Sequence, residues 1–313
     1  MNAAPEPAVL AAPRPPLLLA LVRAFRPAQW TKNGAVFMAA VFTINLYWRP
    51  GEPATLVGVL GKSVVAFLVF CLLSSATYLA NDVADRERDR QHPTKRRRPI
   101  AAGLIPPALA IGAAILLVAT ALPLAMLLNR EFGLVAVLFL VTQALYSFLL
   151  KHEVILDVFT IAAGFALRVI GGAFAIAVPV SPWLYACTIL GALFLGLCKR
   201  RHELLLLEDA ASNHRRSLAG YTPQLLDQMI SVVTAATVVT YSFYTFSAEN
   251  LPRNSAMMLT IPFVLYGLFR YLYLVYQRGL GGSPDELLLR DRPLLVTTAL
   301  WVLASLTVLY FAR

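Results

Sequence analysis

The chain has 313 residues, of which 58% are hydrophobic and 14% are charged, and its mean hydropathy is +0.67. This composition excludes an ordinary soluble domain and indicates a protein that spans a membrane. The net charge of +10 is poor evidence for nucleic-acid binding, because long apolar runs separate the basic segments, and basic loops are typical of the cytoplasmic face of membrane proteins. We therefore expect a membrane environment and no nucleic-acid partner.

The N-terminal segment is rich in Ala and Pro from Met1 to Pro16, and residues 1–22 are predicted to form a disordered tail. The apolar run Leu17–Val22 is too short for a cleavable signal peptide. Residues 23–313 are predicted to form one all-α integral membrane domain, in which each span needs about 20 apolar residues. Nine spans are expected, at about 34–48, 55–80, 108–128, 132–150, 154–178, 183–198, 223–247, 255–276 and 293–311.

Lys and Arg are distributed unevenly between the loops that these spans leave on the two faces of the membrane. Most of the 27 Lys and Arg residues fall on the side of the N-terminus, which is therefore predicted to be cytoplasmic. The two long charged loops, 81–107 and 199–222, lie on that same side, whereas the opposite loops are short and carry few charges. The pattern predicts a polar site that opens to the cytoplasm.

An acidic motif directly follows the apolar run Ser63–Ala80 and is the most informative feature of the chain. On a continuous helix, Asp82, Asp85 and Asp89 fall within an arc of roughly 60°, where their carboxylates repel one another. A hard divalent cation such as Mg²⁺ relieves that repulsion, so these residues, with Asn81 beside them, are candidate metal ligands. The alternative is a solvated helix end in which neighbouring arginines pair with the acids.

Basic residues follow the acidic motif in the run Lys95–Arg98. Beside metal-binding acids, such a run suits phosphate oxygens, and the combination indicates a site for a diphosphate. Anchoring to anionic lipid headgroups explains the same run without any substrate. Tyr146 and Lys151, at the end of the fourth expected span, are candidate substrate contacts with a similar alternative, because Tyr and Lys are common at membrane interfaces.

Asp157 and Arg168 both fall in the fifth expected span. Their separation is close to three helical turns, so the two side chains are expected to point the same way, about 16 Å apart along the axis. A charge near the middle of a bilayer is costly and usually functional, which makes Arg168 a candidate anion ligand. Gly164, Gly171 and Gly172 are expected to allow close helix packing there. The alternative is a structural ion pair with another span.

Two further groups of polar residues fall where the cytoplasmic mouth is expected. Lys199, Arg200 and Glu203 can share a helix face at the start of the second long loop, and Lys32 and Asn33 lie before the first span. All five are candidate substrate-binding residues, with membrane anchoring as the alternative for the loop. The four histidines and three cysteines do not form a zinc-binding pattern, and the chain has no glycine-rich nucleotide-binding loop.

The acidic pattern Asn81–Asp89, the following Arg98-Pro99-Ile100-Ala101-Ala102-Gly103 and the nine expected spans resemble the UbiA superfamily of membrane prenyltransferases. The resemblance covers nearly all of residues 23–311. It implies nine transmembrane helices around a central cavity, a lateral opening for isoprenoid chains, and Mg²⁺ bound at aspartate motifs. Members that make quinones carry a second Asp-x-x-x-Asp motif in the later cytoplasmic loop. This chain has Lys199-Arg200 there, which suits an anion better than a second metal.

Within the superfamily, the chain is similar to a branch that transfers phosphoribosyl groups to lipid phosphates. Five segments carry this resemblance: Arg26-Pro27-x-Gln29-Trp30-x-Lys32-Asn33, His92-Pro93-Thr94-Lys95, Tyr146-Ser147-x-x-x-Lys151, Gly164-Phe165-x-Leu167-Arg168 and Lys199-Arg200-x-x-Glu203. The resemblance implies transfer of 5-phosphoribosyl from phosphoribosyl pyrophosphate to a polyprenyl phosphate such as decaprenyl phosphate, with release of pyrophosphate. It further implies a role in arabinan synthesis for the cell wall, and hence the bacterial inner membrane; a homo-oligomer is compatible with it.

These expectations define a mechanism. Asp82 and Asp85 are the expected catalytic residues, which hold the Mg²⁺ that binds the leaving pyrophosphate. The acceptor phosphate is already an anion and attacks C1 of the ribose from the opposite face, so no protein nucleophile is needed. Arg168 is expected to hold that acceptor phosphate. Two alternatives stay open: a prenyltransferase that moves a prenyl group from a diphosphate to an aromatic acceptor, and a transporter, which the nearly uncharged opposite face disfavours.

Overall fold

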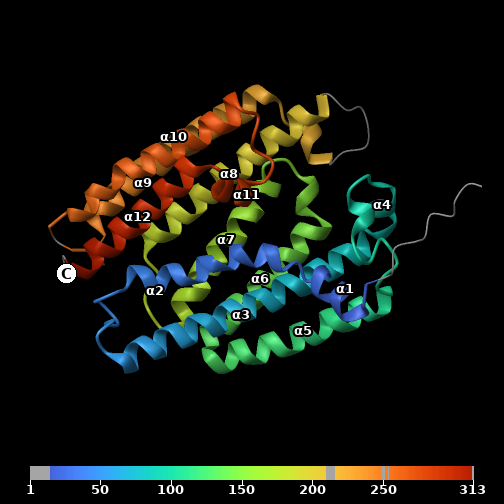
Figure 1. Ribbon diagram of the computed structural model, residues 1–313, viewed down its shortest axis with the longest axis horizontal. Coiled ribbons are helices and arrows are strands. Elements are labelled where there is room, and N and C mark those ends of the chain that lie inside the picture. The colour runs from blue at the N-terminus through green and yellow to red at the C-terminus, as the bar shows by residue number, and fades with distance from the viewer. Residues whose placement is uncertain (1–14, 209–215, 249–250, 253, 312–313) are drawn as a thin grey trace, which may run out of the picture.

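The computed structural model describes residues 15–208, 216–248, 251–252 and 254–311, which are predominantly helical (Figure 1). The N-terminal half contains α1 (Leu17–Ala24), η1 (Pro27–Phe37), α2 (Met38–Phe42), α3 (Pro53–Ala84), α4 (Arg86–Gln91), η2 (Lys95–Arg97), α5 (Pro107–Leu128), α6 (Arg130–Phe148) and η3 (Leu150–His152), where η marks a 3₁₀ helix. The C-terminal half contains α7 (Leu156–Ala175), α8 (Pro182–Glu208), η4 (Arg216–Gly220), α9 (Pro223–Ser247), η5 (Ala256–Thr260), α10 (Ile261–Gln277), α11 (Pro284–Arg290) and α12 (Arg292–Phe311).

Eight helical segments among the described residues are long and apolar enough to cross a membrane. They are α3, α5, α6, α7, α8, α9, α12 and the continuous segment formed by η5 and α10. These eight coincide with the last eight expected spans, which confirms an all-α, multi-pass membrane protein. The count of nine is not confirmed, because the first expected span, 34–48, contains only the end of η1 and the short helix α2.

The irregular first span packs closely against α7. A Cβ atom placed on Gly172 of α7 would lie 2.1 Å from the backbone oxygen of Val36 in η1, so the two backbones touch directly. Gly171 similarly leaves room for the ring of Phe70, which would lie 2.8 Å from an added Cβ. The close packing expected at these two glycines is therefore confirmed.

Part of the expected N-terminal tail is helical. Residues 1–14 lie outside the described residues, but residues 17–22, expected to be disordered, belong to helix α1. One face of α1 buries Ala20 and Ala24 against Leu79 of α3. The apolar sequence was too short to indicate a span, but this packed face is sufficient to order a short helix.

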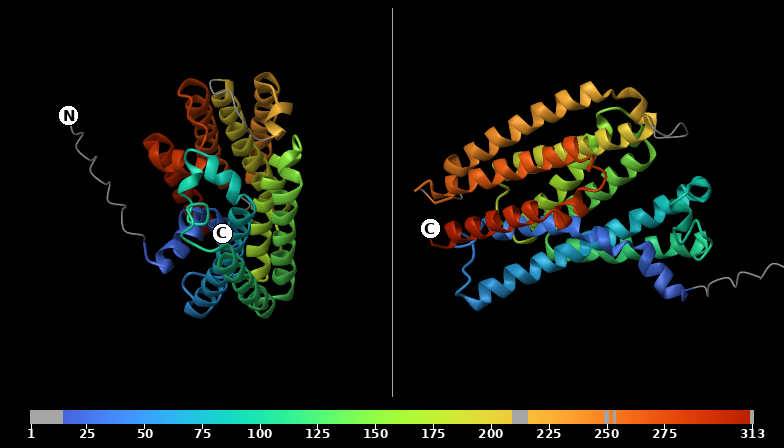
Figure 2. Two further views of the ribbon diagram at one scale, coloured as in Figure 1. Left: turned by 90° about the vertical axis from the view of Figure 1, so that its right-hand side faces the viewer. Right: turned by 45° about the horizontal axis from the view of Figure 1, so that its top comes forward.

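Two apolar cores flank α7, which is the most enclosed of the membrane helices. One core joins α3, α5 and α6 and contains the edge-to-face rings of Phe70, Phe132 and Phe139. The other joins α7, α8, α9 and α10 and contains Phe194 and Tyr271. Figures 1 and 2 show that α4 and the C-terminal end of α8 lie at the same end of the bundle. The acidic motif and the charged residues 199–208 thus lie at the same end, although residues 199–208 continue helix α8 instead of beginning the expected loop 199–222.

Candidate active site

The acidic motif does not lie on one continuous helix, contrary to expectation. Helix α3 ends at Ala84, Asp85 follows it as a cap, and Asp89 belongs to the separate short helix α4. Asp82 and Asp89 are nonetheless both buried, with 2% and 3% exposure. Across this break, arginine side chains rather than a shared helix face connect the two carboxylates.

Arg98 bridges the two buried acids. Its Nη1 donates to Asp89 Oδ2 at 2.7 Å and to Asp82 Oδ1 at 3.1 Å. Arg26 also donates to Asp82 Oδ1, and its guanidinium lies 4.9 Å from the ring centre of Tyr78. Arg26 has a left-handed backbone (φ 55°) between α1 and η1, which is uncommon for a residue other than glycine. These two arginines relieve the repulsion that the sequence predicts between the carboxylates.

Asp85 is the most accessible of the three aspartates, with 31% of its side chain exposed. Lys151 Nζ, from η3, lies 3.8 Å from Asp85 Oδ2, and Arg88 lies 3.6 Å from Asp85 Oδ1. Asn81, one turn before Asp85, is half-buried. Two residues singled out separately in the sequence, Asp85 and Lys151, are therefore neighbours at the open end of α3.

Asn33 and Arg168 form a second buried group, between η1 and α7. Arg168 Nε donates to Asn33 Oδ1 at 2.7 Å, and Arg168 Nη1 donates to the carbonyl oxygen of Gly164 at 2.7 Å. The guanidinium also lies over the rings of Phe139 and Phe165, at 4.7 and 5.5 Å. These partners are neutral, so the positive charge of Arg168 has no carboxylate counter-ion among the contacts described.

Asp157 and Arg200 form an ion pair between α7 and α8, with Arg200 Nε 2.7 Å from Asp157 Oδ2. Their side chains are 0% and 2% exposed. Both charged groups are therefore enclosed by protein and paired with each other. The structure also separates Asp157 from Arg168, which lies along the same helix but contacts η1.

The loop that precedes α9 is tied to the same ion pair. Tyr221 OH donates to Asp157 Oδ1 at 2.9 Å and accepts from the backbone N–H of Ile155 at 2.7 Å. Burial raises the pKa of Tyr221 to about 12, with the neighbouring Asp157 carboxylate acting in the same direction. Tyr221 is therefore a neutral hydrogen-bond donor at physiological pH. It also stabilises Ile155 at φ 70°, an unusual conformation for a β-branched residue.

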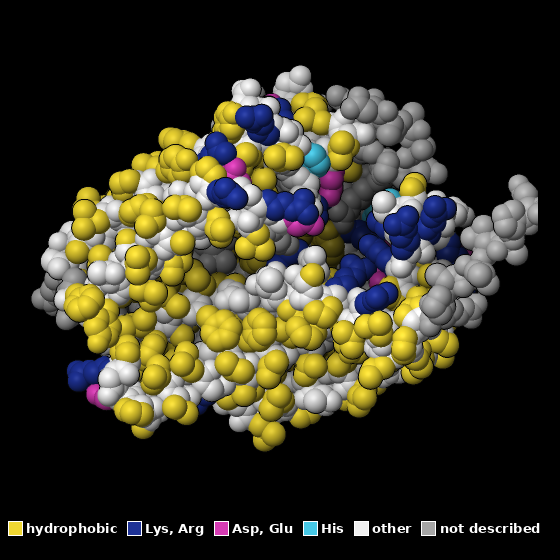
Figure 3. Space-filling model, in the orientation of Figure 1, with side chains coloured by type: hydrophobic (Ala, Val, Ile, Leu, Met, Phe, Trp, Pro, Cys, Tyr) yellow, Lys and Arg dark blue, Asp and Glu magenta, His cyan; other side chains and the backbone are white. Residues whose placement is uncertain are grey.

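Lys199 and Glu203 occupy the remaining side of α8 at this end. Arg200 faces Asp157 of α7, and Arg201 faces Asp227 of α9 at 2.6 Å. At about 100° per residue, Lys199 and Glu203 share a direction away from Arg201 and hence away from α9. Figure 3 shows charged side chains gathered around a hollow at this end of the molecule.

Within this pair, Lys199 Nζ lies 3.9 Å from Glu203 Oε1, and Arg200 donates to Glu203 Oε2. Three other residues were expected to contact substrate. Tyr146, near the end of α6, is close enough to Arg200 for an electrostatic interaction. Lys32 is half-buried in η1, and Lys95 is exposed in η2. All the candidate residues come from segments at this end of the bundle or from the adjoining buried group.

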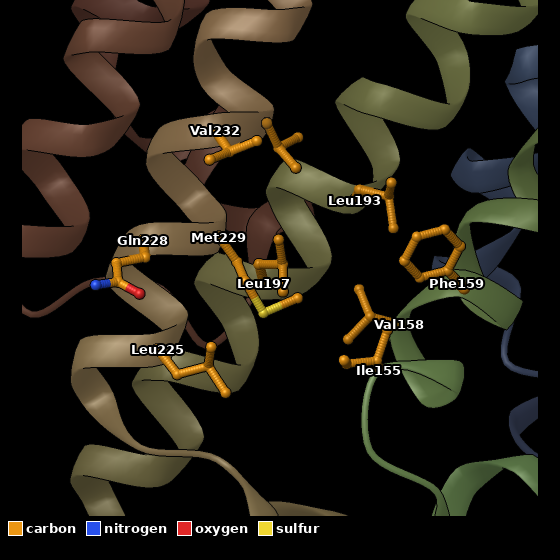
Figure 4. Close-up of a pocket in the computed structure, with 10 residues that line it drawn as sticks. Ile155, Val158, Phe159, Leu193, Leu197, Leu225, Gln228, Met229 and Val232 are labelled. Atoms are coloured by element: carbon orange, nitrogen blue, oxygen red, sulfur yellow. The ribbon is translucent and has the colours of Figure 1, made fainter.

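Two cavities lie beside these clusters. One, of about 270 Å³, is an apolar groove between α7, α8 and α9, lined by side chains such as Val158, Leu193 and Met229, with Gln228 at its edge (Figure 4). The other, of about 410 Å³, lies between α8 and α11 and contains His202 and Asp291. Neither contains the acidic motif, so both are separate from the charged hollow.

Comparison with known proteins agrees with this arrangement. The model of the UbiA prenyltransferase family matches residues 30–283, which is most of the chain and includes the acidic motif, the Asn33–Arg168 group and the Asp157–Arg200 pair. This chain belongs to the UbiA prenyltransferase family.

Several curated relatives within the UbiA family are named decaprenyl-phosphate phosphoribosyltransferase. The protein from Mycobacterium tuberculosis is 36% identical over 94% of this chain and 95% of its own length. Those from Mycolicibacterium smegmatis and Corynebacterium glutamicum are each 34% identical, over 96% and 95% of this chain and 96% and 89% of their own lengths.

Solved UbiA structures share the fold. A UbiA homologue from Archaeoglobus fulgidus bound to GPP and Mg²⁺ has a TM-score of 0.69 with this chain, at 19% identity, over 93% of this chain and 99% of that one. A structure concerning digeranylgeranylglyceryl phosphate synthase has a TM-score of 0.66 at 15% identity, over 94% and 99%. These likenesses establish that the helical arrangement of this chain is that of the UbiA fold.

The side chains available as metal ligands in this UbiA-family chain fit a divalent cation that is also bound by a substrate phosphate. The described residues contain no group of three or more His, Cys, Asp or Glu side chains that could hold a metal by themselves. Asp82 and Asp85, however, lie one turn apart at the end of α3. Mg²⁺ is commonly bound by one or two carboxylates together with waters and substrate phosphates, and the accessible Asp85 with the buried Asp82 one turn away meets that requirement.

Sequence reasoning missed Arg26 and Arg98 as members of the site. Arg98 stood out only as one of several basic residues, and Arg26 only within a motif. Neither is near Asp82 in the sequence, so no local spacing could indicate the contact. A signal was nevertheless present: three carboxylates beside a hydrophobic span require compensating charge, and arginine is the residue best suited to contact several oxygens at once.

Proposed function

We propose that this chain transfers a 5-phosphoribosyl group from phosphoribosyl pyrophosphate to decaprenyl phosphate, or to a similar polyprenyl phosphate, and releases pyrophosphate. The observation that carries the proposal is the 34–36% identity, over 94–96% of this chain, with relatives named decaprenyl-phosphate phosphoribosyltransferase. The charged hollow at the end of the membrane helices supports it, because a water-soluble anion and a lipid phosphate must meet at such a boundary.

In this proposal, Asp82 and Asp85 hold Mg²⁺, with Asn81 beside them. When bound, the metal supplies positive charge that stabilises the departing pyrophosphate. Asp89 takes a supporting role instead of the expected ligand role, because its carboxylate is buried against Arg98. Asp82 must exchange part of its contact with Arg26 and Arg98 for the metal. The two released guanidinium groups, each partly exposed, are then available to the pyrophosphate oxygens.

Basic residues around the hollow neutralise the remaining negative charge of the donor phosphates. Lys151 lies beside Asp85 and is suited to the pyrophosphate, whereas Lys199, with 43% of its side chain exposed, is suited to the 5-phosphate. Lys32 and Lys95 provide further positive charge at the rim. Arg200, enclosed by Asp157 and Glu203, orients these neighbours and does not itself contact phosphate. Tyr146 packs near the Arg200 pair and supports it.

Arg168 and Asn33 bind the phosphate of the acceptor lipid in this mechanism. A buried guanidinium with only neutral partners favours an incoming anion, because a phosphate would supply the missing counter-charge. One acceptor phosphate oxygen forms a bond to C1 of the ribose, while the bond from C1 to the pyrophosphate oxygen breaks and its electron pair leaves with pyrophosphate. The configuration at C1 inverts. Positioning and fixed charge provide most of the acceleration.

The proposed orientation in the membrane follows from the location of the charged residues and of the donor. The charged end of the bundle faces the cytoplasm, where phosphoribosyl pyrophosphate is available, and the N-terminus lies on that side. The protein resides in the bacterial inner membrane. Its product is a phosphoribosyl lipid suited to arabinan synthesis for the cell wall. This orientation and role are parts of the proposal that rest on charge distribution and on the named relatives.

Radiolabelled donor tests the proposed function directly. Purified protein in detergent or nanodiscs is supplied with Mg²⁺, decaprenyl phosphate and phosphoribosyl pyrophosphate labelled in the ribose. We expect label in the lipid extract and one pyrophosphate released for each lipid labelled. A parallel reaction contains geranyl diphosphate and 4-hydroxybenzoate. Prenylation of the aromatic acid without labelling of the lipid would replace the proposal with the prenyltransferase alternative.

A further inference from the structure

Glu203 is held in an unusual electrostatic setting at the edge of the charged hollow. Its Oε2 accepts from Arg200, whose side chain is only 2% exposed, and its Oε1 lies 3.9 Å from Lys199 Nζ. The Arg200 guanidinium is itself fixed by Asp157. Glu203 is therefore preorganised by a buried anchor, yet 30% of its side chain stays accessible.

The direction of Glu203 is set by its neighbours on α8. Arg200 turns toward α7, Arg201 turns toward α9, and His202 packs against Gly282 of the α10–α11 connection, where an added Cβ would lie 2.8 Å from His202 Nε2. At about 100° per residue, Glu203 points between the directions of Arg200 and His202. Its partly exposed carboxylate therefore lies on the side of α8 that is turned away from the Arg201 contact with α9.

The charge around Glu203 favours a neutral hydrogen-bond donor as its ligand. Arg200 and Lys199 together balance the two carboxylates of Asp157 and Glu203, so the cluster has no net negative charge to attract a divalent cation. An ionised carboxylate nevertheless has about four lone-pair sites, of which Lys199 and Arg200 use only part. Hydroxyl groups can donate to the remaining sites without adding charge. Carboxylates bind the hydroxyl groups of ribose in this way in dinucleotide-binding proteins.

We infer that Glu203 binds the ribose hydroxyl groups of the donor and thereby selects a phosphorylated pentose over a prenyl diphosphate. The inference rests on the proposed function and deepens it. Lys199, one turn away, places a phosphate-binding cation directly beside the hydroxyl acceptor, which matches a sugar phosphate. A prenyl chain has no hydroxyl groups to offer this carboxylate. Arg200 and Asp157 are positioning residues for it.

The test compares two donors in wild type and in Glu203→Ala. One donor is phosphoribosyl pyrophosphate and the other is its 2-deoxyribosyl counterpart, and kcat/KM for transfer to decaprenyl phosphate is measured for each. The intrinsic reactivities of the two donors cancel when the ratio of their kcat/KM values is compared between the proteins. We expect Glu203→Ala to lower kcat/KM for the ribosyl donor by about 10- to 100-fold, the effect of losing hydrogen bonds to a charged acceptor. The kcat/KM for the deoxyribosyl donor should fall less, so the ratio of ribosyl to deoxyribosyl kcat/KM should be lower in Glu203→Ala than in wild type.

Two further measurements separate binding from folding. Thermal stabilisation by each donor without acceptor reports binding independently of turnover, and we expect Glu203→Ala to reduce stabilisation by the ribosyl donor more than by the deoxyribosyl donor. Glu286→Gln is the matched control, since Glu286 also pairs with an arginine, Arg290, but is 61% exposed on α11. Glu286→Gln should have the same ratio of kcat/KM values as wild type and the same thermal stabilisation by each donor.

The inference is overturned if the donor ratio stays at its wild-type value in Glu203→Ala, whether both activities fall together or neither changes. An equal loss for both donors would show that Glu203 acts only in the structure of α8. Failure of the proposed function is distinguishable, because in that case wild-type protein transfers neither pentose to the lipid.

Discussion

Lys151 Nζ lies 3.8 Å from Asp85 Oδ2, although the two residues come from η3 and from the end of α3. The contact joins the acidic motif to the segment that leads into α7, where Asp157 pairs with Arg200 of α8. The connection between α6 and α7 therefore lies between the acidic motif and the Asp157–Arg200 pair.

Asp82→Asn should abolish turnover without unfolding the protein. The amide loses the negative charge that the metal requires but keeps the size of the side chain and one oxygen for Arg26 and Arg98. We expect the rate of lipid labelling to fall by more than about 100-fold, which corresponds to a loss of roughly 3 kcal/mol in transition-state stabilisation. Gel filtration and a thermal melt check the fold.

The control for this variant is Asp227→Asn. Asp227 is also an aspartate at the same end of the bundle, and it accepts hydrogen bonds from Arg201 and Tyr276 at 2.6 and 2.8 Å. It has no role in the proposed site, so its variant should retain most of the activity. Mg²⁺-dependent turnover close to wild type in Asp82→Asn would contradict the metal assignment.

Arg168→Lys should weaken binding of the lipid acceptor. Lysine keeps the positive charge but has no planar group that can contact Asn33 and Gly164 together while lying over Phe139. We expect KM for decaprenyl phosphate to rise by about 10-fold or more, with KM for the donor nearly unchanged. Initial rates measured against each substrate in turn provide the check. A change confined to the donor KM would place Arg168 in the donor site instead.

The membrane helices could be predicted from the sequence, because a long apolar run in lipid can pair all its backbone N–H and C=O groups within itself by forming a helix. The regions whose structure differs from the sequence-based prediction are held by contacts between residues that are far apart in the sequence. Helix α3 ends at Ala84 where Arg98 draws Asp89 back toward Asp82. Such a bridge leaves no trace in helical spacing, and the continuous-helix interpretation of the acids was wrong for that reason.

The same distinction applies to the candidate site. The residue types around the hollow could be recognised from the sequence, because carboxylates beside basic residues at the end of an apolar run indicate metal and phosphate chemistry. The contacts that these residues make with one another could not be predicted from the sequence. Arg200 is as basic as Lys199, yet its pairing with Asp157 removes it from the surface. Only the packing of α7 against α8 distinguishes a positioning arginine from a lysine that is accessible to substrate.

Tyr221→Phe should destabilise the connection between the two halves of the site. The hydroxyl group donates to Asp157 and accepts from the Ile155 N–H, so its loss leaves a partly buried N–H without that partner. We expect unfolding to become easier by about 1–3 kcal/mol, the usual effect of leaving a buried polar group unsatisfied. Amide exchange at Ile155 and in the first turn of α7 should accelerate, whereas α3 serves as the internal reference. Uniform acceleration in both helices would contradict a local effect.

The ion pair of Asp291 with Arg270 should make stability depend on pH in the acid range. Arg270 donates to both carboxylate oxygens, at 3.1 and 2.8 Å, and these bonds hold the pKa of Asp291 below its ordinary value of 3.8. Because the folded-state pKa is the lower one, the pair contributes its full stability above about pH 4. The contribution is lost progressively as the pH falls below 3.8 and through the folded-state pKa, since unfolded chains take up the proton first.

Thermal melts of wild type and Asp291→Asn between pH 6 and pH 3 measure this dependence. The variant should melt at a lower temperature at pH 6, because it lacks the ionised partner of Arg270. The difference between the two proteins should begin to narrow as the pH falls below about 4, where unfolded chains take up the proton, and it should close only as the pH falls through the lower folded-state pKa of Asp291. Other acids titrate in both proteins, so their effects cancel in the difference. A gap of constant size across the range would mean that Asp291 stabilises the start of α12 by packing and backbone capping, without a contribution from its charge.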